Sequence, residues 1–136
     1  MLARPHSPIH TVVFVVLLAA IFAAGQSQPK PHAKVVVLDK SGSGIFPILT
    51  GPPETVTMKS GYVVLEPGRS VGQHSTEHHE ELLVILEGQG EMIFHDGSKL
   101  EIKARTALYC PPETEHDVTN TGSETLRYVY VVANAQ

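Results

Sequence analysis

Residues 68–88 read Gly68-Arg-Ser-Val-Gly-Gln-His74-Ser-Thr-Glu-His78-His79-Glu-Glu81-Leu-Leu-Val-Ile-Leu-Glu-Gly88. Three histidines and three acidic residues lie within eight positions, and an apolar run that ends at a glycine follows them directly. Imidazole and carboxylate groups together suit a divalent ion of the first transition row. The stretch therefore predicts metal ligands at the start of a buried strand.

A further histidine stands downstream, in Pro111-Pro-Glu-Thr-Glu-His116-Asp-Val-Thr-Asn120. Ligands carried on strands are held rigidly, which a metal site requires. If the fold brings His116 against residues 74–81, the chain contains one metal site built from two distant segments.

The first 25 residues have the pattern of a secretory signal peptide. Arg4 supplies a positive charge, and Val12–Ala24 is an uninterrupted apolar run. The run is shorter than the roughly 20 residues that span a bilayer, and the small residues at 23–25 suit cleavage before Gln26. We expect a secreted or periplasmic protein that has no membrane segment once the signal is removed; the alternatives are an uncleaved anchor or a buried core segment.

Charge and cysteine content narrow the function classes. Arg4 is the only Lys or Arg before residue 26, so the mature chain keeps 9 of the 10 basic residues and all 14 acidic ones. This acidic balance lacks the basic footprint of a nucleic-acid-binding protein. Cys110 is the single cysteine; it is expected to be a buried thiol, with an intermolecular disulfide or a metal contact as the alternative.

Short apolar stretches separated by turns predict an all-β fold. The expected strands are Lys34–Leu38, Val56–Met58, Gly61–Glu66, Glu81–Leu86, Gly90–His95, Lys99–Ile102, Ala107–Cys110, Asp117–Thr119 and Leu126–Ala133. Asp96-Gly97 is a hairpin signal between two of them. Residues 42–51 are interpreted as a loop because they contain Gly-Ser-Gly and a proline. Many short strands without a helical pattern favour a sandwich or barrel.

Two strands are apolar on both faces. Leu82–Leu86 contains only aliphatic residues, which predicts that both of its faces are covered. In Leu126–Val132 the even positions form one apolar and aromatic face, and Val129 and Val131 form the other. One covering layer is the barrel interior, and the other is expected to be a second sheet or a second subunit. We therefore expect a homodimer, with a well-covered monomer as the alternative.

The two histidine-containing segments resemble the two sequence motifs of the cupin superfamily. In the first motif, Gly68, five residues and His74 match, as do Glu81, six residues and Gly88. Thr76 stands where the motif has its second histidine. In the second motif, Pro111, His116 and Asn120 match, whereas Arg105 and Glu113 replace glycines. The resemblance covers residues 56–133 and implies a cupin-type double-stranded β-helix, or jelly-roll, barrel.

The resemblance also implies a ligand set for a divalent metal, which would be Fe, Mn, Zn, Ni or Cu. Carried over by position, the ligands are His74, Glu81 and His116. Thr76 is a poor ligand, so a neighbouring histidine is expected to be the fourth. On an extended strand, His79 shares a face with Glu81 and His78 points away, which favours His79. A bulge or turn between Ser75 and Glu80 could reverse that choice.

The expected domain organisation is a signal peptide at 1–25, a leader with an N-terminal strand or loop at 26–55, and the barrel at 56–136. The leading functional hypothesis is an exported, metal-dependent enzyme that acts on a small polar organic molecule. The alternative is a non-catalytic binding protein for a sugar or carboxylate. The fold hosts both classes, so function must be argued from the site.

Overall fold

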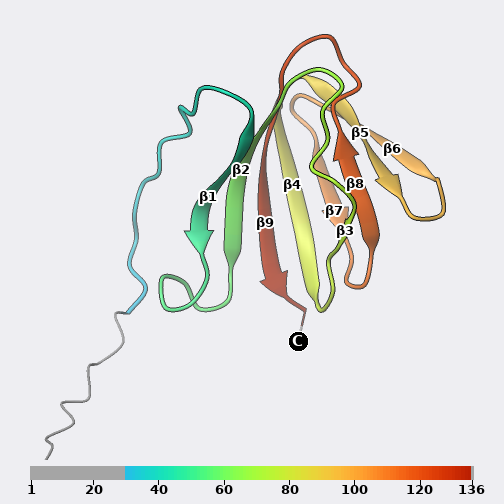
Figure 1. The fold of residues 1–136 in the computed structure, drawn as a ribbon. Coiled ribbons are helices and arrows are strands. Elements are labelled where there is room, and N and C mark those ends of the chain that lie inside the picture. Colours follow the sequence, from blue (N-terminus) through green and yellow to red (C-terminus); the bar gives the residue numbers. More distant parts are fainter. Residues whose placement is uncertain (1–29, 136) are drawn as a thin grey trace, which may run out of the picture.

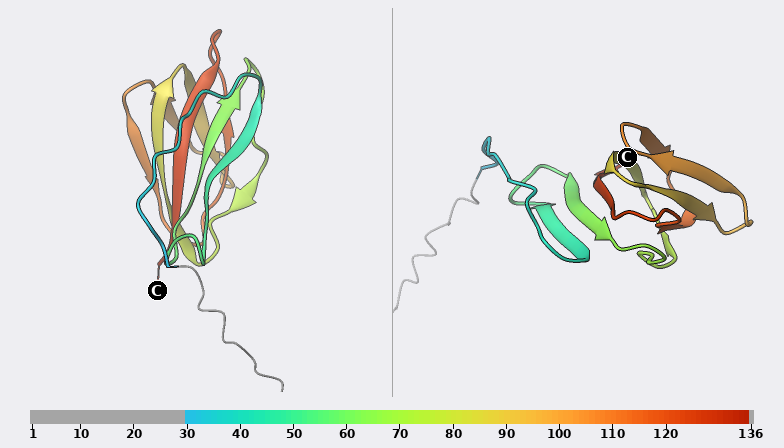
Figure 2. Two further views of the ribbon diagram at one scale, coloured as in Figure 1. Left: turned by 90° about the vertical axis from the view of Figure 1, so that its left-hand side faces the viewer. Right: turned by 90° about the horizontal axis from the view of Figure 1, so that it is seen from above.

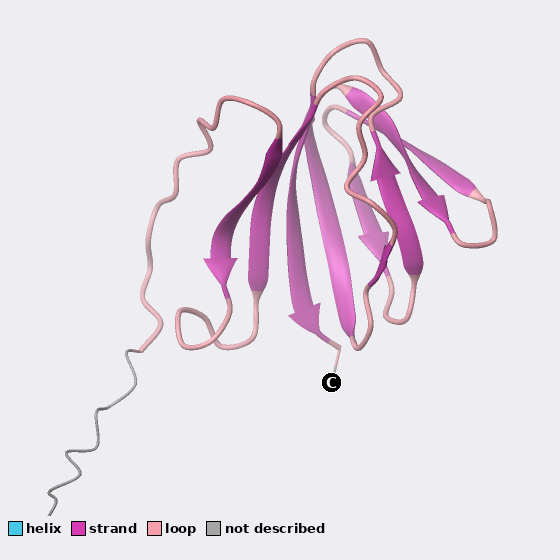
Figure 3. Cartoon of the chain, viewed as in Figure 1, coloured by secondary structure: helices cyan, strands magenta, loops and turns pink. Residues whose placement is uncertain are grey.

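The computed structural model describes residues 30–135, which form nine strands (Figure 1). In order along the chain these are β1 (Gly44–Thr50), β2 (Lys59–Leu65), β3 (His74–Ser75), β4 (His79–Glu87), β5 (Gln89–Phe94), β6 (Lys99–Lys103), β7 (Ala107–Cys110), β8 (Glu115–Thr119) and β9 (Leu126–Asn134). Strands joined by loops make up this whole described range (Figure 3), which confirms the all-β prediction.

The strands form two antiparallel sheets. One has the order β1-β2-β9-β4-β7, and the other has the order β3-β8-β5-β6. The chain crosses repeatedly from one sheet to the other, as the view from above shows (Figure 2). Because of these crossings, segments that are distant in sequence lie on facing walls, and β3 and β8 come to lie opposite β4.

The core lies between the sheets and follows the period-two pattern of the strands. In β4, Leu83 and Ile85 are each 1% exposed, whereas the alternate residues Leu82 and Val84 are 41% and 37% exposed. The other core side chains include Val63, Leu65, Met92, Ile102, Leu108, Val118, Leu126 and Tyr128. Full burial of each aliphatic side chain contributes about 1.5–3 kcal/mol to folding.

The described chain leaves one face of β4 uncovered, so the expectation that Leu82–Leu86 is covered on both faces is wrong for a single copy. The inner face packs in the core, but the outer face carries Leu82, Val84 and Leu86, all more than a third exposed. In β9 the even positions face inward as expected, since Leu126 and Tyr128 are 0% and 3% exposed.

Three predictions at the N-terminal side are wrong. Residues 34–38 and 56–58 lie outside the strands, and the expected loop at 42–51 contains β1. Residues 34–38 are rich in valine, but no strand within residues 30–135 pairs with them, and Val35 is 93% exposed. β1 instead pairs with β2, and a bulge between Pro47 and Leu49 accommodates the proline, which strands tolerate at edges and bulges.

The predicted hairpin at Asp96-Gly97 is confirmed. It joins β5 to β6, Gly97 has a φ of 82°, and the Asp96 carboxylate accepts hydrogen bonds from the Ser98 amide and hydroxyl. Gly88 connects β4 to β5 with a φ of 77°. A Cβ on Gly88 would lie 2.5 Å from the Thr125 carbonyl oxygen, so this turn has no room for a side chain.

Arg105 and Glu113, which replace two glycines of the second motif, keep the left-handed backbone that glycine favours. Their φ angles are 67° and 55°. A left-handed conformation costs a non-glycine residue about 1–2 kcal/mol. The turns before and after β7 are therefore preserved in shape, at some cost in stability.

Replacing Arg105 by glycine is expected to stabilise the protein by about 1 kcal/mol, because the strained φ is relieved. Chemical denaturation of the variant and the wild type measures the difference. Lys103→Gly is the matched control, since glycine within β6 should destabilise by about 0.5–1 kcal/mol. Equal destabilisation by the two changes would contradict the strain at Arg105.

The predicted signal peptide, residues 1–25, lies outside the described residues. Within residues 30–135, the structure has no helix of the length and apolar character needed to cross a bilayer.

Candidate metal centre

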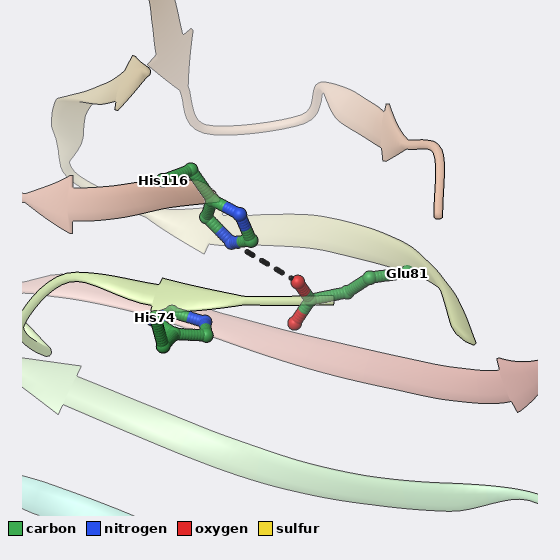
Figure 4. A group of neighbouring side chains, drawn as sticks. All are labelled: His74, Glu81 and His116. Carbon is green, nitrogen blue, oxygen red and sulfur yellow. Dashed lines mark ion pairs between the residues drawn. The ribbon is translucent and has the colours of Figure 1, made fainter. Parts of the chain in front are cut away.

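The structure brings three of the predicted ligands together, each from a different strand (Figure 4). His74 lies on β3, Glu81 on β4 and His116 on β8. One potential ligand atom of each residue lies within 4.8 Å of the other two. His74 and His116 are direct partners in the β3–β8 register, and their ring centroids are 4.4 Å apart. The two motif segments thus meet in space as the sequence predicts.

Both imidazole rings are oriented by backbone carbonyls. The Nδ1 atom of His74 lies 2.9 Å from the Gly72 carbonyl oxygen, and that of His116 lies 3.1 Å from the Thr114 carbonyl oxygen. A carbonyl only accepts, so each Nδ1 carries the proton and donates it. The lone pair of each ring is then on Nε2, the atom left to bind a metal. Such carbonyl contacts commonly fix the tautomer of ligating histidines.

The Nε2 atom of His116 is a buried polar atom that lacks a hydrogen-bond partner within residues 30–135. Its nearest charged group is the Glu81 carboxylate, whose Oε2 lies 3.2 Å away without hydrogen-bond alignment. An unsatisfied polar atom in a protein interior is costly. The pair is therefore arranged as two ligands that face a common point, which fits a divalent cation.

The Glu81 carboxylate is only 8% exposed and influences the ionisation of its neighbours. Burial lowers the pKa of His116, but the nearby Glu81 carboxylate and the Thr114 carbonyl outweigh this effect, so the net pKa lies above its ordinary value. Burial, reinforced by the Glu81 charge, raises the pKa of both Tyr128 and Tyr130. The Glu81 charge thus disfavours ionisation of neighbouring groups to anions, and a cation bound beside it would be stabilised.

Cys110 is fully buried, and burial together with the Glu81 charge raises the pKa of its thiol to about 11. Its sulfur lies 3.6 Å from the His116 Nδ1, an atom that already donates to a carbonyl. The thiol therefore packs behind the imidazole as a neutral group, in agreement with the expectation of a buried thiol.

Thr76, at the position where the motif has a second histidine, has a structural contact of its own. It is 7% exposed, and its hydroxyl donates to the Pro111 carbonyl at 2.8 Å and accepts from the Thr114 amide at 2.9 Å. Thr114 in turn holds the His116 ring through its carbonyl. Thr76 thus positions the loop that orients a ligand.

His79 and His78 point in different directions, but not through strand alternation alone. The chain turns at residues 77–78, where Glu77 has a φ of 50°, and β4 begins at His79. His79 is half-buried and lines the cavity that contains the cluster, although it lies outside the group of three converging ligands. The side chain of His78 is 90% exposed and lies 4.0 Å from Glu113. Ligation by His79 stays a prediction.

A cavity of about 450 Å³ opens onto the three ligands. Its walls are mainly apolar, from Val63, Val118, Tyr128, Tyr130 and Val132, with polar groups from Lys59, Gln73, Glu77 and His79. Gly61 makes room for the Tyr130 ring, because a Cβ there would lie 2.5 Å from it. A cavity whose apolar walls carry several polar groups is typical of small-molecule sites.

Other predicted residues have structural roles. Asn120 is 1% exposed and holds a turn: its side chain donates to the Leu65 and Glu124 carbonyls and accepts from the Gly122 amide. His95, beside the hairpin turn, is exposed as expected. Tyr62 accepts a hydrogen bond from Arg127, away from the cavity.

Sequence reasoning missed Thr114 and Lys59. Thr114 acts through its backbone amide and carbonyl. Every residue other than proline has these groups, so the identity of residue 114 does not reveal the role. The expected strand began at Gly61, but β2 begins at Lys59. With the strand extended by these two residues, the period of two places Lys59 on the same face as Val63, which lines the cavity.

The chain belongs to the cupin domain family, whose pattern it matches over residues 61–132. It is 38% identical over 69 residues to an oxalate-binding protein of Thermotoga maritima, covering 50% of this chain and 55% of that protein. The chain thus spans about half the length of the curated relatives that it matches.

Solved structures of proteins with a cupin or double-stranded β-helix domain share the fold. A cupin 2 conserved barrel domain protein from Salinispora arenicola aligns with a TM-score of 0.64 and 23% identity over 76% of this chain and 91% of that one. A protein with a double-stranded β-helix domain from Klebsiella pneumoniae aligns with a TM-score of 0.63 and 22% identity, over 77% and 93%. The predicted fold class, a cupin-type double-stranded β-helix, is thereby confirmed.

Proposed function

We propose that this protein holds one divalent metal on His74, Glu81 and His116 and binds a small carboxylate at the open coordination positions. The observation that carries the proposal is the convergence of two oriented imidazoles and one buried carboxylate at the base of a cavity. Two histidines and one carboxylate with open positions suit iron and related first-row ions.

The chemistry of the site supports a ligand that binds through oxygen. A bound divalent metal supplies Lewis-acid polarisation of a coordinated oxygen atom. His74, Glu81 and His116 would hold the metal, and the cavity beside them would admit the ligand. The similarity to an oxalate-binding protein also favours a small carboxylate.

Titration calorimetry with oxalate tests this proposal. Protein loaded with one equivalent of Mn²⁺, Fe²⁺ or Zn²⁺ is expected to bind oxalate, whereas protein stripped by a chelator and dialysed is not. Equal oxalate affinity with and without metal would refute a metal-mediated site. Inability of the metal-loaded protein to bind oxalate would refute the carboxylate part of the proposal.

A metal-dependent enzyme is the second candidate. Its support is the presence of further ionisable groups, His79 and Tyr130, in the wall of the same cavity. Groups placed in this way can transfer protons if they reach the bound molecule. Incubation of the metal-loaded protein with oxalate separates the candidates: unchanged oxalate recovered after many hours supports binding alone, and its consumption supports catalysis.

We also propose that the protein is exported, on the basis of Arg4 and the apolar run Val12–Ala24. Expression of the full chain in a bacterial host with a secretory pathway, followed by intact-mass measurement, tests this. Cleavage near Gln26 is expected, and an intact N-terminus on cytoplasmic protein would contradict it.

A second copy of the chain is proposed to cover the outer face of β4 and β7. Leu82 and Tyr109 are register partners across these strands and are 41% and 57% exposed, with Val84 and Leu86 beside them. An apolar sheet face of this kind is typical of an interface. Light scattering is expected to show a dimer that Leu82→Glu with Val84→Glu dissociates; a monomeric wild type at micromolar concentration would contradict it.

The choice between His79 and His78 as a further ligand gives a paired prediction. His79→Ala is expected to weaken metal affinity by at least about 10-fold, since loss of even a contact that supports a ligand weakens a metal site about 10–100-fold. His78→Ala is expected to leave it unchanged, because that side chain points to solvent. Competition with a chromogenic chelator measures both, and the opposite ranking would contradict the strand parity.

A further inference from the structure

Lys59 lies on the same face of the sheet as the metal ligand Glu81. In the β2–β9 register Lys59 pairs with Val132, and in the β4–β9 register Val132 pairs with Glu81. Directly opposite residues on neighbouring strands share a face, so the three side chains form one row across the inner wall. With strands about 4.8 Å apart, the Cα atoms of Lys59 and Glu81 are separated by about 10 Å.

The ammonium group of Lys59 is available to bind a ligand. Within residues 30–135 no carboxylate lies within ion-pair distance of it, whereas Lys34, Lys99 and Arg127 each have an acidic partner. The methylene stem of Lys59 packs against Gly51. A Cβ built on this glycine would lie only 3.2 Å from the Lys59 Cε atom. Lys59 thus contributes an unpaired positive charge to the wall of the cavity.

The wall between Lys59 and the ligand cluster is apolar. Val132 lies between Lys59 and Glu81 in their row. Tyr130 lies in the neighbouring row, opposite Gly61 and Leu83. Along these two rows the wall is apolar between Glu81, one of the three metal ligands, and Lys59. The polar residues Gln73, Glu77 and His79 also line the cavity but lie outside the two rows.

We infer that Lys59 is the second anchor of the bound molecule and that the site selects small dicarboxylates with a short hydrocarbon spacer. One carboxylate would occupy the metal end, the spacer would lie along Val132 and Tyr130, and the other carboxylate would accept from the Lys59 ammonium. A monocarboxylate of the same length can occupy the metal end, but it offers no acceptor to the Lys59 ammonium group. This inference rests on the proposed function, because the first anchor is the metal-bound position.

Succinate and butyrate test the inference as a matched pair, since they differ mainly in the second carboxylate. Calorimetry on the metal-loaded wild type is expected to show succinate binding about tenfold more tightly than butyrate, the effect of one charge-assisted contact. In Lys59→Met the two affinities should become equal within about twofold, while metal content stays the same because Lys59 is not a ligand. Lys103→Met, which removes an equal charge from β6 outside the cavity, should keep the wild-type preference.

The outcomes separate this inference from the function on which it rests. If the wild type binds metal and oxalate but shows no preference for succinate over butyrate, the Lys59 anchor is wrong and the proposed function stands. A preference that survives in Lys59→Met would also overturn the anchor. If the wild type binds neither metal nor oxalate, both proposals are overturned.

Discussion

Replacing both His74 and His116 by alanine is expected to lower metal affinity by more than about 100-fold and to leave a folded barrel. The double variant leaves only the Glu81 carboxylate of the three converging groups, and loss of even a supporting contact typically weakens a metal site 10–100-fold. Elemental mass spectrometry after dialysis against a weak chelator measures the loss, and circular dichroism reports the fold.

The matched control replaces two histidines outside the cluster, His78 and His95, which are both exposed. It should keep the metal content of the wild type. Because His116 is fully buried, its truncation leaves a void, and the single variant His74→Ala provides a second test at an exposed position. Stoichiometric metal retained in a folded His74→Ala/His116→Ala protein would contradict the site.

Thr76→Val is expected to destabilise the fold by about 2–4 kcal/mol and to weaken metal binding at the same time. Valine keeps the shape of threonine but leaves the Pro111 carbonyl and the Thr114 amide without their partner. Each partly buried group left unpaired costs about 1–3 kcal/mol. Since Thr114 also orients His116, the ligand should lose its alignment. Denaturant titration and chelator competition measure the two effects.

Thr76→Ser is the control, because it keeps the hydroxyl and should retain most of the stability and the metal affinity. If Thr76→Val is destabilised but binds metal as tightly as the wild type, the loop contact matters for folding alone. If both variants resemble the wild type, the proposed role of Thr76 in positioning His116 is wrong.

Much of the fold was predictable because alternation of apolar and polar residues reports directly on strands. The strands from Gly61 onward were located within a few residues, except β3 (His74–Ser75), which was not predicted. The Asp96-Gly97 turn has local chemistry that specifies it. The N-terminal side was harder. Val35 lies in a stretch with strong β-propensity, but a strand also needs a neighbour, and propensity does not reveal whether one is present.

The candidate site could be predicted because His74, Glu81 and His116 lie in motif positions. The preference for His79 over His78 as a further ligand rested on strand alternation and stays a prediction. The sequence did not reveal why a threonine could occupy the position of a histidine. That explanation depends on contacts between Thr76 and the loop after β7, which are 35 and 38 residues away. Arg105 and Glu113 show the same limit, because their left-handed backbone is preserved without the glycines that usually indicate it.

The metal content of a purified chain of residues 26–136, which lacks the proposed signal peptide, tests the proposed metal site. The protein should be prepared without a metal-binding tag and analysed by elemental mass spectrometry, both as isolated and after reconstitution with each of Fe²⁺, Mn²⁺, Zn²⁺, Ni²⁺ and Cu²⁺. About one equivalent of one of these metals per chain is expected. The absence of bound metal after every reconstitution would contradict the site and would favour the alternative of a small-ligand-binding cupin without a metal.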